Sequence, residues 1–173
     1  MNYIGIDPGI GGGLASIFNR GFTHAFKFHD KSMAVLWNTI RYYSMVPKTE
    51  ITVYIEEQLP RPTRWTDKET SEPRSSILRS TCILYGEYCK MVAWLTAGEI
   101  HFTTVQPKMW QKAHGLFREK GEKEVSWKNR LVDKARELFP KVKVTHYIAD
   151  ALLIANFARI KVGRAERKKG TLA

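Results

Sequence analysis

Three carboxylates end or interrupt apolar runs of the sequence, where a charged side chain is unusual. Asp7 ends the first apolar run of the chain and directly precedes a glycine-rich turn. Glu56 ends a second short run, residues 51–55, which is rich in β-branched side chains. Asp150 lies inside the apolar run 148–155, where an acid either faces solvent or is buried and needs a cation.

Each acid taken alone also has an ordinary structural explanation. Asp7 can cap the turn that follows it, Glu56 can be a solvated strand end, and Asp150 can lie on the outer face of a helix. Their joint occurrence favours a shared site, because two strand ends and one helix can converge at one edge of a sheet. Converging carboxylates repel one another unless a cation lies among them, and oxygen ligands select Mg²⁺ or Mn²⁺. Two such ions, about 3.5–4 Å apart, suit phosphodiester hydrolysis.

A histidine strengthens this hypothesis. His146 precedes Asp150 by four residues, so both side chains lie on one face of a helix. The imidazole can ligate a metal or position an attacking water. The alternative is a surface or helix-capping histidine.

The charge distribution indicates a polyanionic partner. The chain of 173 residues has 28 Lys and Arg against 17 Asp and Glu, a formal net charge of +11. Residues 1–104 carry a net charge of +1, whereas residues 105–173 carry +10. The concentration of basic residues in the C-terminal part of the chain favours nucleic acid over a membrane surface as the partner. The alternative is a basic surface that serves only solubility.

The elements that must position these residues follow from apolar periodicity. We expect three meander strands, then helix, strand, helix, strand and further helices, which is the pattern of a mixed α/β sheet flanked by helices. The predicted strands cover residues 3–7, 14–18, 22–28, 51–55 and 101–105, and the predicted helices run from Ser32 to Pro47, over 75–97, from Ser126 to Phe139 and over 147–162. Residues 59–74 are expected to form a loop, and residues 106–124 a basic, glycine-containing segment.

Cysteine usage and hydropathy predict a soluble, intracellular protein. Cys82 and Cys89 are seven residues apart on one predicted helix, too distant for a disulfide, and we expect buried thiols in a reducing compartment. The N-terminus lacks the apolar region of a signal peptide, and no apolar stretch of about 18 residues is long enough to span a membrane. We therefore expect a cytoplasmic location.

Three motifs, in this order, resemble those of the RuvC-type Holliday junction resolvases. They are Ile4-Gly5-Ile6-Asp7-Pro8-Gly9, Val53-Tyr54-Ile55-Glu56 and Ile148-Ala149-Asp150-Ala151-Leu152. The block Trp110-Gln111-Lys112 looks most like the phage-encoded branch, in which case the cytoplasm would be that of the host cell. The resemblance covers nearly the whole chain and implies a nuclease domain over residues 1–160, followed by a basic, flexible tail over residues 161–173.

The resemblance implies a ribonuclease-H-like fold with a mixed five-stranded sheet, and a homodimer that nicks four-way DNA junctions using two Mg²⁺ ions per site, with Mn²⁺ as a substitute. It implies that Asp7, Glu56 and Asp150 are catalytic metal ligands. Many members carry a fourth ligand one helical turn before the last acid, where bacterial members use a spacing of three. That position is Tyr147 here, so we assign the role to His146. Glu57 competes with Glu56, and only one can reach the site, because adjacent strand residues face opposite ways.

Family members also contact DNA through basic residues between the last strand and the penultimate helix. The first candidates here are Lys112 and Lys128, and the second are Lys108 and Lys123. Any of these can instead be an ordinary solvated lysine. Leu59 occupies a position that family members use near the junction centre. Trp65, with Arg61 and Arg64 beside it, can stack on bases or simply anchor its loop.

The predicted helix 75–97 carries apolar residues on more than one face. Tyr85, Cys89 and Val92 form a surplus face that a symmetric dimer contact would cover, unless the sheet and its neighbours bury the helix completely.

Other functions remain open. A ribonuclease-H-like nuclease acting on other branched DNA or on RNA–DNA hybrids needs the same acids, because loops and dimer geometry decide the substrate. A non-catalytic nucleic-acid binder would gain nothing from acids near phosphates. A kinase-like ATP binder shares Asp7-Pro8-Gly9, but the chain is too short for two domains and lacks a phosphate-binding loop of the Gly-x-x-x-x-Gly-Lys type.

Overall fold

The computed structural model describes residues 1–9, 11–18, 22–28, 33–45, 47, 50–58 and 75–170. The predicted DNA contacts Leu59, Arg61, Arg64 and Trp65 lie outside these residues. The remaining predicted site residues all lie within them.

A mixed sheet of five strands forms the centre of the fold, with the order β3-β2-β1-β4-β5. The central strand β1 pairs antiparallel with β2 and parallel with β4, and β4 pairs parallel with β5. The strands are β1 (Asn2–Asp7), β2 (Gly13–Ile17), β3 (Thr23–Lys27), β4 (Ile51–Glu56) and β5 (Phe102–Val105). The predicted class, a mixed five-stranded α/β sheet flanked by helices, is confirmed.

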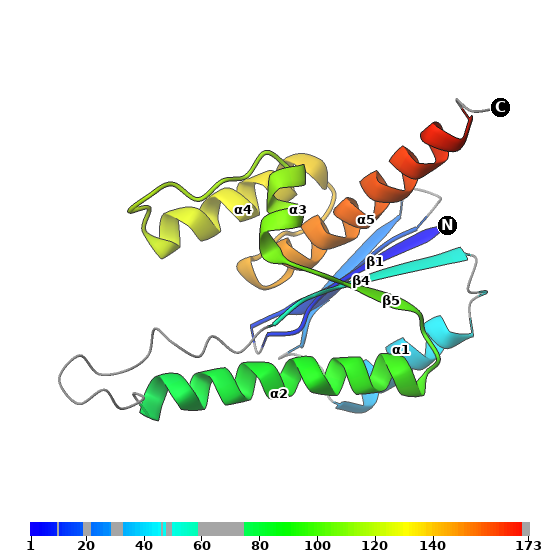
Figure 1. Ribbon diagram of the computed structural model, residues 1–173, viewed down its shortest axis with the longest axis horizontal. Helices are drawn as coiled ribbons and strands as arrows, with labels where there is room; N and C mark the ends of the chain where they lie inside the picture. The colour runs from blue at the N-terminus through cyan, green and yellow to red at the C-terminus, as the bar shows by residue number, and fades with distance from the viewer. Residues whose placement is uncertain are drawn as a thin grey trace.

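Helices cover both faces of this sheet, as Figure 1 shows. The helices α1 (Met33–Ser44) and α2 (Ser75–Ala97) lie on one face, and α5 (His146–Gly170) lies on the other, with α3 (Pro107–Ala113) and α4 (Glu124–Leu138) beside it. Each face has its own apolar core. Alternate residues of β1 serve the two cores, since Ile4 and Ile6 pack on the α2 side and Tyr3 packs on the α5 side.

The contact between β1 and α5 is unusually close. Gly5 lies against α5 so tightly that a Cβ atom there would overlap the backbone of Ala151 and Ala155. Both of these helix residues are completely buried. Glycine on the strand and alanine on the helix therefore bring the two backbones together, and this contact sets the distance between the ends of β1 and α5.

Three helices differ from their predicted extents. The seven-residue helix α3 was expected as an irregular basic segment, because so short a helix leaves little apolar periodicity. Helix α4 begins at Glu124 with Lys123 as its N-cap residue, so the predicted cap Ser126 lies within the helix. Helix α5 continues to Gly170, eight residues past the predicted end at Val162, over the region expected as a tail. None of the helices in the described part of the chain is long and apolar enough to cross a membrane.

The prediction of buried cysteines is wrong. Cys82 and Cys89 are both exposed on α2. The helix buries only the stripe that faces the sheet, where Met91 and Leu95 are almost fully enclosed, and its cysteines lie outside that stripe. Tyr85 is likewise exposed, at 41%, whereas Val92 is partly buried against the core. Within the single chain, α2 therefore does present a partly uncovered face with apolar side chains.

Candidate active site

Two of the predicted acids end neighbouring parallel strands. Asp7 is the last residue of β1 and Glu56 the last residue of β4, and the register pairs Ile6 with Ile55 directly before them. Because parallel strands end at the same edge of a sheet, the two acids emerge side by side. Helix α5 begins at this edge, which places Asp150 in its second turn.

A cavity of about 230 Å³ opens at this edge. Two of the predicted acids, the predicted histidine and one predicted lysine share its wall. Its lining consists of Asp7, Gly9, Gly11, Gly12, Leu84, Lys128, Leu131, His146, Ala149 and Asp150. The residues come from β1, the glycine turn, α2, α4 and α5, so the cavity exists only in the folded chain.

The three acids interact electrostatically. Burial raises the pKa of Glu56 well above its usual value, and the charges of Asp7 and Asp150 raise it further. Burial and then the charge of Asp7 raise the pKa of Asp150 to about 7, against the opposing effect of Lys128. Burial also raises the pKa of Asp7, which a hydrogen bond from Gly9 and the charge of Lys128 lower in part. The fold therefore concentrates negative charge where water screens it poorly.

The glycine turn holds Asp7 in place. The amide of Gly9 donates to Asp7 Oδ1 at 3.2 Å, and the amide of Gly12 donates to the Gly9 carbonyl at 2.8 Å. A Cβ atom on Gly12 would overlap the carbonyl oxygen of Asp7. Only glycine fits that close approach, so the turn is built around the acid and also caps its carboxylate.

Two donors hold the Glu56 carboxylate. Trp110 Nε1 donates to Oε2 at 2.9 Å, and Gln58 Nε2 donates to Oε1 at 3.1 Å. The competing acid Glu57 lies on the other side of the sheet. Burial raises the pKa of Tyr88 on α2, and the charge of Glu57 adds to this effect, which places Glu57 towards α2. The structure thus brings Glu56, rather than Glu57, to the other two acids.

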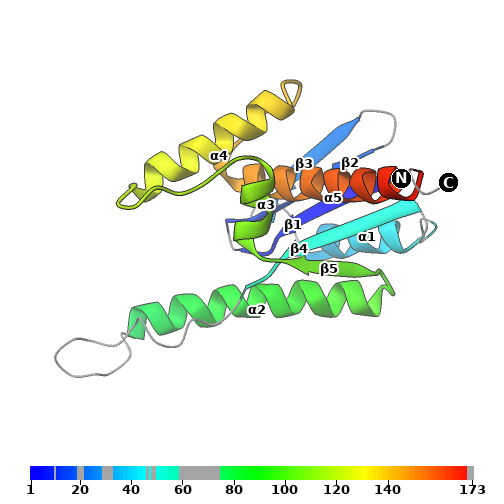
Figure 2. The same ribbon diagram turned by 45° about the horizontal axis from the view of Figure 1, so that its top comes forward.

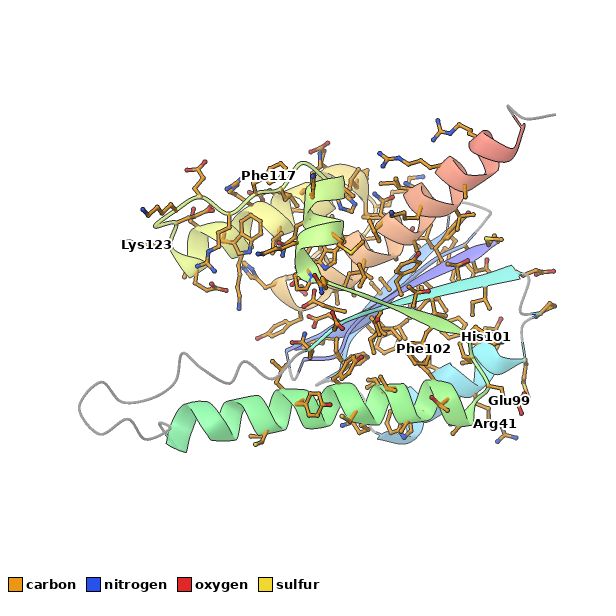
Figure 3. All side chains as sticks on the ribbon, viewed as in Figure 1. Arg41, Glu99, His101, Phe102, Phe117 and Lys123 are labelled. Carbon is orange, nitrogen blue, oxygen red and sulfur yellow. The ribbon has the colours of Figure 1, made fainter. Side chains whose placement is uncertain are left out.

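One of the four predicted lysines is at the cavity. Lys128 on α4 lines it and lowers the pKa values of Asp7 and Asp150. Lys108, Lys112 and Lys123 are exposed on α3 and at the start of α4, and none of them lines the cavity. Figure 3 shows Lys123 at the projecting end of α4.

The first two residues of α5 differ in their position relative to the cavity. His146 is exposed and lines the cavity wall. Tyr147 is 46% exposed and packs beside Gly11, with the ammonium of Lys27 5.0 Å from its ring centroid. His146 is therefore the residue of this pair that borders the acids, whereas Tyr147 covers the glycine turn.

The donors in this site fit a hard divalent cation chemically. Asp7, Glu56 and Asp150 offer carboxylate oxygens, and such an ion would offset both the cost of their partial burial and the repulsion that Asp7 exerts on Glu56 and Asp150. In the described residues, no set of three or more His, Cys, Asp or Glu side chains is gathered closely enough to hold a metal as it stands. The electrostatics of the acids, rather than a preformed ligand cage, are thus the observation in favour of a cation.

The residues that support Glu56 are not predicted as such from the sequence. Trp110 belongs to the block Trp110-Gln111-Lys112, and neither His114 nor Asn156 belongs to any of the predicted motifs. One signal was available in the sequence, because the polar residue Asn156 directly follows the apolar run 148–155 that contains Asp150; in the fold it is 2% exposed. A buried side-chain amide needs hydrogen-bond partners, so a buried asparagine at this position indicates a network of hydrogen bonds.

The arrangement is that of an α/β chain with an acidic site at the carboxyl edge of its mixed sheet. No protein-family model matches the chain, and no curated protein matches its sequence. Among solved structures, the chain is similar to RuvC of T. thermophilus in complex with Holliday junction substrate, with 16% identity over 90% of each chain and a TM-score of 0.47. It is also similar to the Thermus thermophilus RuvC structure, with 15% identity over 90% of this chain and 91% of that chain and a TM-score of 0.44.

Proposed function

We propose that the chain is a metal-dependent endonuclease that resolves four-way DNA junctions. The observation that carries this proposal is the convergence of Asp7, Glu56 and Asp150 at one edge of the sheet, beside Lys128. Partial burial raises the pKa of all three acids, and the charge of Asp7 raises the pKa of Glu56 and Asp150 further, so this arrangement is costly to the fold. A catalytic cation bound by these acids would explain why the fold retains such an unfavourable arrangement.

Asp7, Glu56 and Asp150 would hold two Mg²⁺ ions, or Mn²⁺ in their place, with His146 as the fourth ligand at the rim. When bound, such ions supply charge stabilisation for the developing and departing oxygens of a phosphodiester. Asp7 is fixed for this task by Gly9, and Glu56 by Trp110 and Gln58.

The cationic side chain at the cavity has a distinct role. Lys128 would attract the scissile phosphate, because its charge lies among acids that otherwise repel DNA. Lys112 would contact the DNA backbone outside the cavity, and Lys108 and Lys123 are the secondary candidates for such contacts. The resulting contacts follow phosphates rather than bases, which suits recognition of a branched shape.

Homodimer formation through α2 is part of this proposal. Tyr85 and Cys89 are exposed on α2 and Val92 is partly covered, so a second copy of the chain can bury this face. A two-fold dimer presents two sites to the two opposed strands of a junction. The reaction would take place in the cytoplasm, and the resemblance of Trp110-Gln111-Lys112 to the phage-encoded branch stays a prediction.

A panel of substrates tests the proposed specificity. The purified protein is incubated with Mg²⁺ and a four-way junction, a flap, an RNA–DNA hybrid or a linear duplex of matched sequence. The proposal predicts paired, symmetric nicks in the junction and little cutting of the duplex. Preferred cutting of the flap or the hybrid would instead favour the related nuclease functions.

A further inference from the structure

The Glu56 carboxylate lies at the end of a chain of hydrogen bonds that begins on the buried helix α5. Arg159 donates to Asn156 Oδ1 at 2.7 Å, and the Asn156 amide nitrogen lies 2.9 Å from His114 Nε2. His114 Nδ1 lies 2.7 Å from the carbonyl oxygen of Trp110, whose indole nitrogen donates to Glu56 Oε2 at 2.9 Å. The chain thus joins α5, α3 and β4.

The chemistry of the partners fixes the direction of every bond. A guanidinium only donates, so its partner on Asn156 is the carbonyl oxygen, and the amide NH₂ group faces His114. His114 Nε2 must then accept, which places the ring proton on Nδ1 and directs it to the carbonyl oxygen of Trp110. Each donor therefore points towards Glu56, and the imidazole is neutral.

Trp110 has little freedom in this setting. Its side chain is 1% exposed and belongs to the core on the α5 side, so the ring cannot turn away without opening that core. Strand β5 pairs Val105 with Glu56, and α3 begins two residues after Val105, which brings the indole over the end of β4. A buried indole N–H needs an acceptor, and Glu56 is the acceptor here.

The two donors leave Glu56 able to bind a cation. Each carboxylate oxygen has two lone pairs and accepts one described hydrogen bond, Oε2 from Trp110 and Oε1 from Gln58. One acceptor position on each oxygen thus remains for a metal ion. This is the arrangement expected of a ligand whose orientation is set by its neighbours.

We propose that Trp110 is a positioning residue, which aims the Glu56 carboxylate at the cation site, and that His114 and Asn156 hold Trp110 in register. The inference rests on the proposed function, because it assumes that Glu56 binds a divalent cation. It gives α3 a role at the cation site, in addition to the DNA contacts proposed for Lys108 and Lys112.

The test measures binding of Mn²⁺ to the DNA-free protein by titration calorimetry. Trp110→Phe keeps the ring but removes the N–H donor, and we expect Mn²⁺ affinity to fall about 10–100-fold, the range for neighbours that orient a metal ligand. Trp127→Phe is the matched control, since Trp127 is also buried in this core and makes no described hydrogen bond to an acid; its affinity should equal that of the parent. Equal affinity for Trp110→Phe and the parent would overturn the proposal.

A second pair of variants tests the imidazole without relying on stability. His114→Asn places an amide N–H close to the position of ring Nδ1 and should retain most of the Mn²⁺ affinity, whereas His114→Leu should lose it. A loss that is equal in both, or absent in both, contradicts the role of His114.

Cleavage is measured separately, so that the two proposals can fail separately. A parent that binds Mn²⁺ through Asp150 but cuts no DNA leaves the role of Trp110 intact and removes the nuclease. A parent that binds no Mn²⁺ contradicts both.

Discussion

Gly5 on β1 lies directly against Ala151 on α5, with no room for a single additional carbon atom between the two backbones. Asp7 follows Gly5 by two residues and Asp150 precedes Ala151 by one, so this contact sets how close the two acids come. The electrostatic coupling of the acids is therefore a consequence of backbone packing.

Gly5→Ala should disrupt this contact. The added methyl group overlaps the carbonyl oxygen of Ala151 and the amide nitrogen of Ala155, and backbone atoms cannot move aside as a side chain would. We expect a loss of about 1–3 kcal/mol or more in the free energy of unfolding, measured by urea denaturation. Gly86→Ala is the control, because Gly86 lies in α2 with nothing within 4 Å of an added Cβ, and it should stabilise the protein by about 0.5–1 kcal/mol. Equal effects of the two substitutions would contradict the close contact.

The buried acids should make stability fall as pH rises. The pKa of Asp150 is about 7 in the fold against an ordinary value of 3.8, so between these two pH values the folded state holds a proton that the unfolded state has released. The stability from this group is fully present below about pH 4 and is lost as pH rises through about 7, and the raised pKa values of Asp7 and Glu56 act in the same direction.

Asp150→Asn should therefore raise the melting temperature at pH 8 in the presence of a chelator. The gain is roughly 2–4 °C for each 1 kcal/mol by which the cost of burying this charge beside Asp7 is relieved, and it should shrink towards pH 4. Thermal scans of the parent and the variant across this range measure it. A variant that is less stable than the parent at pH 8 would contradict the unfavourable burial of this charge.

Divalent ions should reverse the loss of stability that the ionised acids cause at pH 8. Mg²⁺ or Mn²⁺ binds the folded site and not the unfolded chain, so adding either at pH 8 should raise the melting temperature of the parent, increasingly with concentration. The same addition should leave Asp150→Asn nearly unchanged, because the variant lacks one carboxylate. A chelator should return the parent to its original value. An equal shift in both proteins would indicate binding elsewhere.

Much of the site was predictable because its acids occupy unusual places in the sequence. Asp7 and Glu56 end apolar runs and Asp150 interrupts one, and each position conflicts with the local pattern unless it has a function. Trp110 is different, since its partner Glu56 is 54 residues away and the bond leaves no local pattern in either segment.

For the helices too, features that depend on contacts distant in the sequence were not predictable. The extent of α2 was predictable from its long apolar pattern, but the exposure of Cys82 and Cys89 depends on which stripe meets the sheet. The short helix α3 follows from Pro107 and the end of β5, and its seven residues carry too few apolar positions to reveal a period.

Lys128 should contribute to DNA binding as a phosphate contact. Lys128→Gln, made together with Asp150→Asn so that the DNA stays uncut, should weaken junction binding, and the slope of log K against log salt should become less steep by about 0.9 for one lost phosphate. Arg41→Gln in the same background is the control, because Arg41 lies on α1, far from Lys123 and the projecting end of α4 (Figure 3). If both substitutions changed the slope equally, Lys128 would have no special role.

The geometry around the cavity explains why DNA is expected there. Helices α2 and α4 both project beyond the sheet on the side where the parallel strands end (Figure 2). A branched DNA bound at the cavity would therefore meet α4 and the basic segment before it. Lys128 and the acids lie at the base of this region.

Cleavage of a synthetic four-way junction is the most direct test of the central claim, that Asp7, Glu56 and Asp150 form one cation site for phosphodiester hydrolysis. The parent and Asp150→Asn are each incubated with the junction, in Mg²⁺ and in a chelator, and binding is recorded in parallel. We expect nicks only for the parent in Mg²⁺, with binding retained by the variant. Nicking by Asp150→Asn at the rate of the parent, or by the parent in the chelator, would show that these acids are not the cation site for hydrolysis.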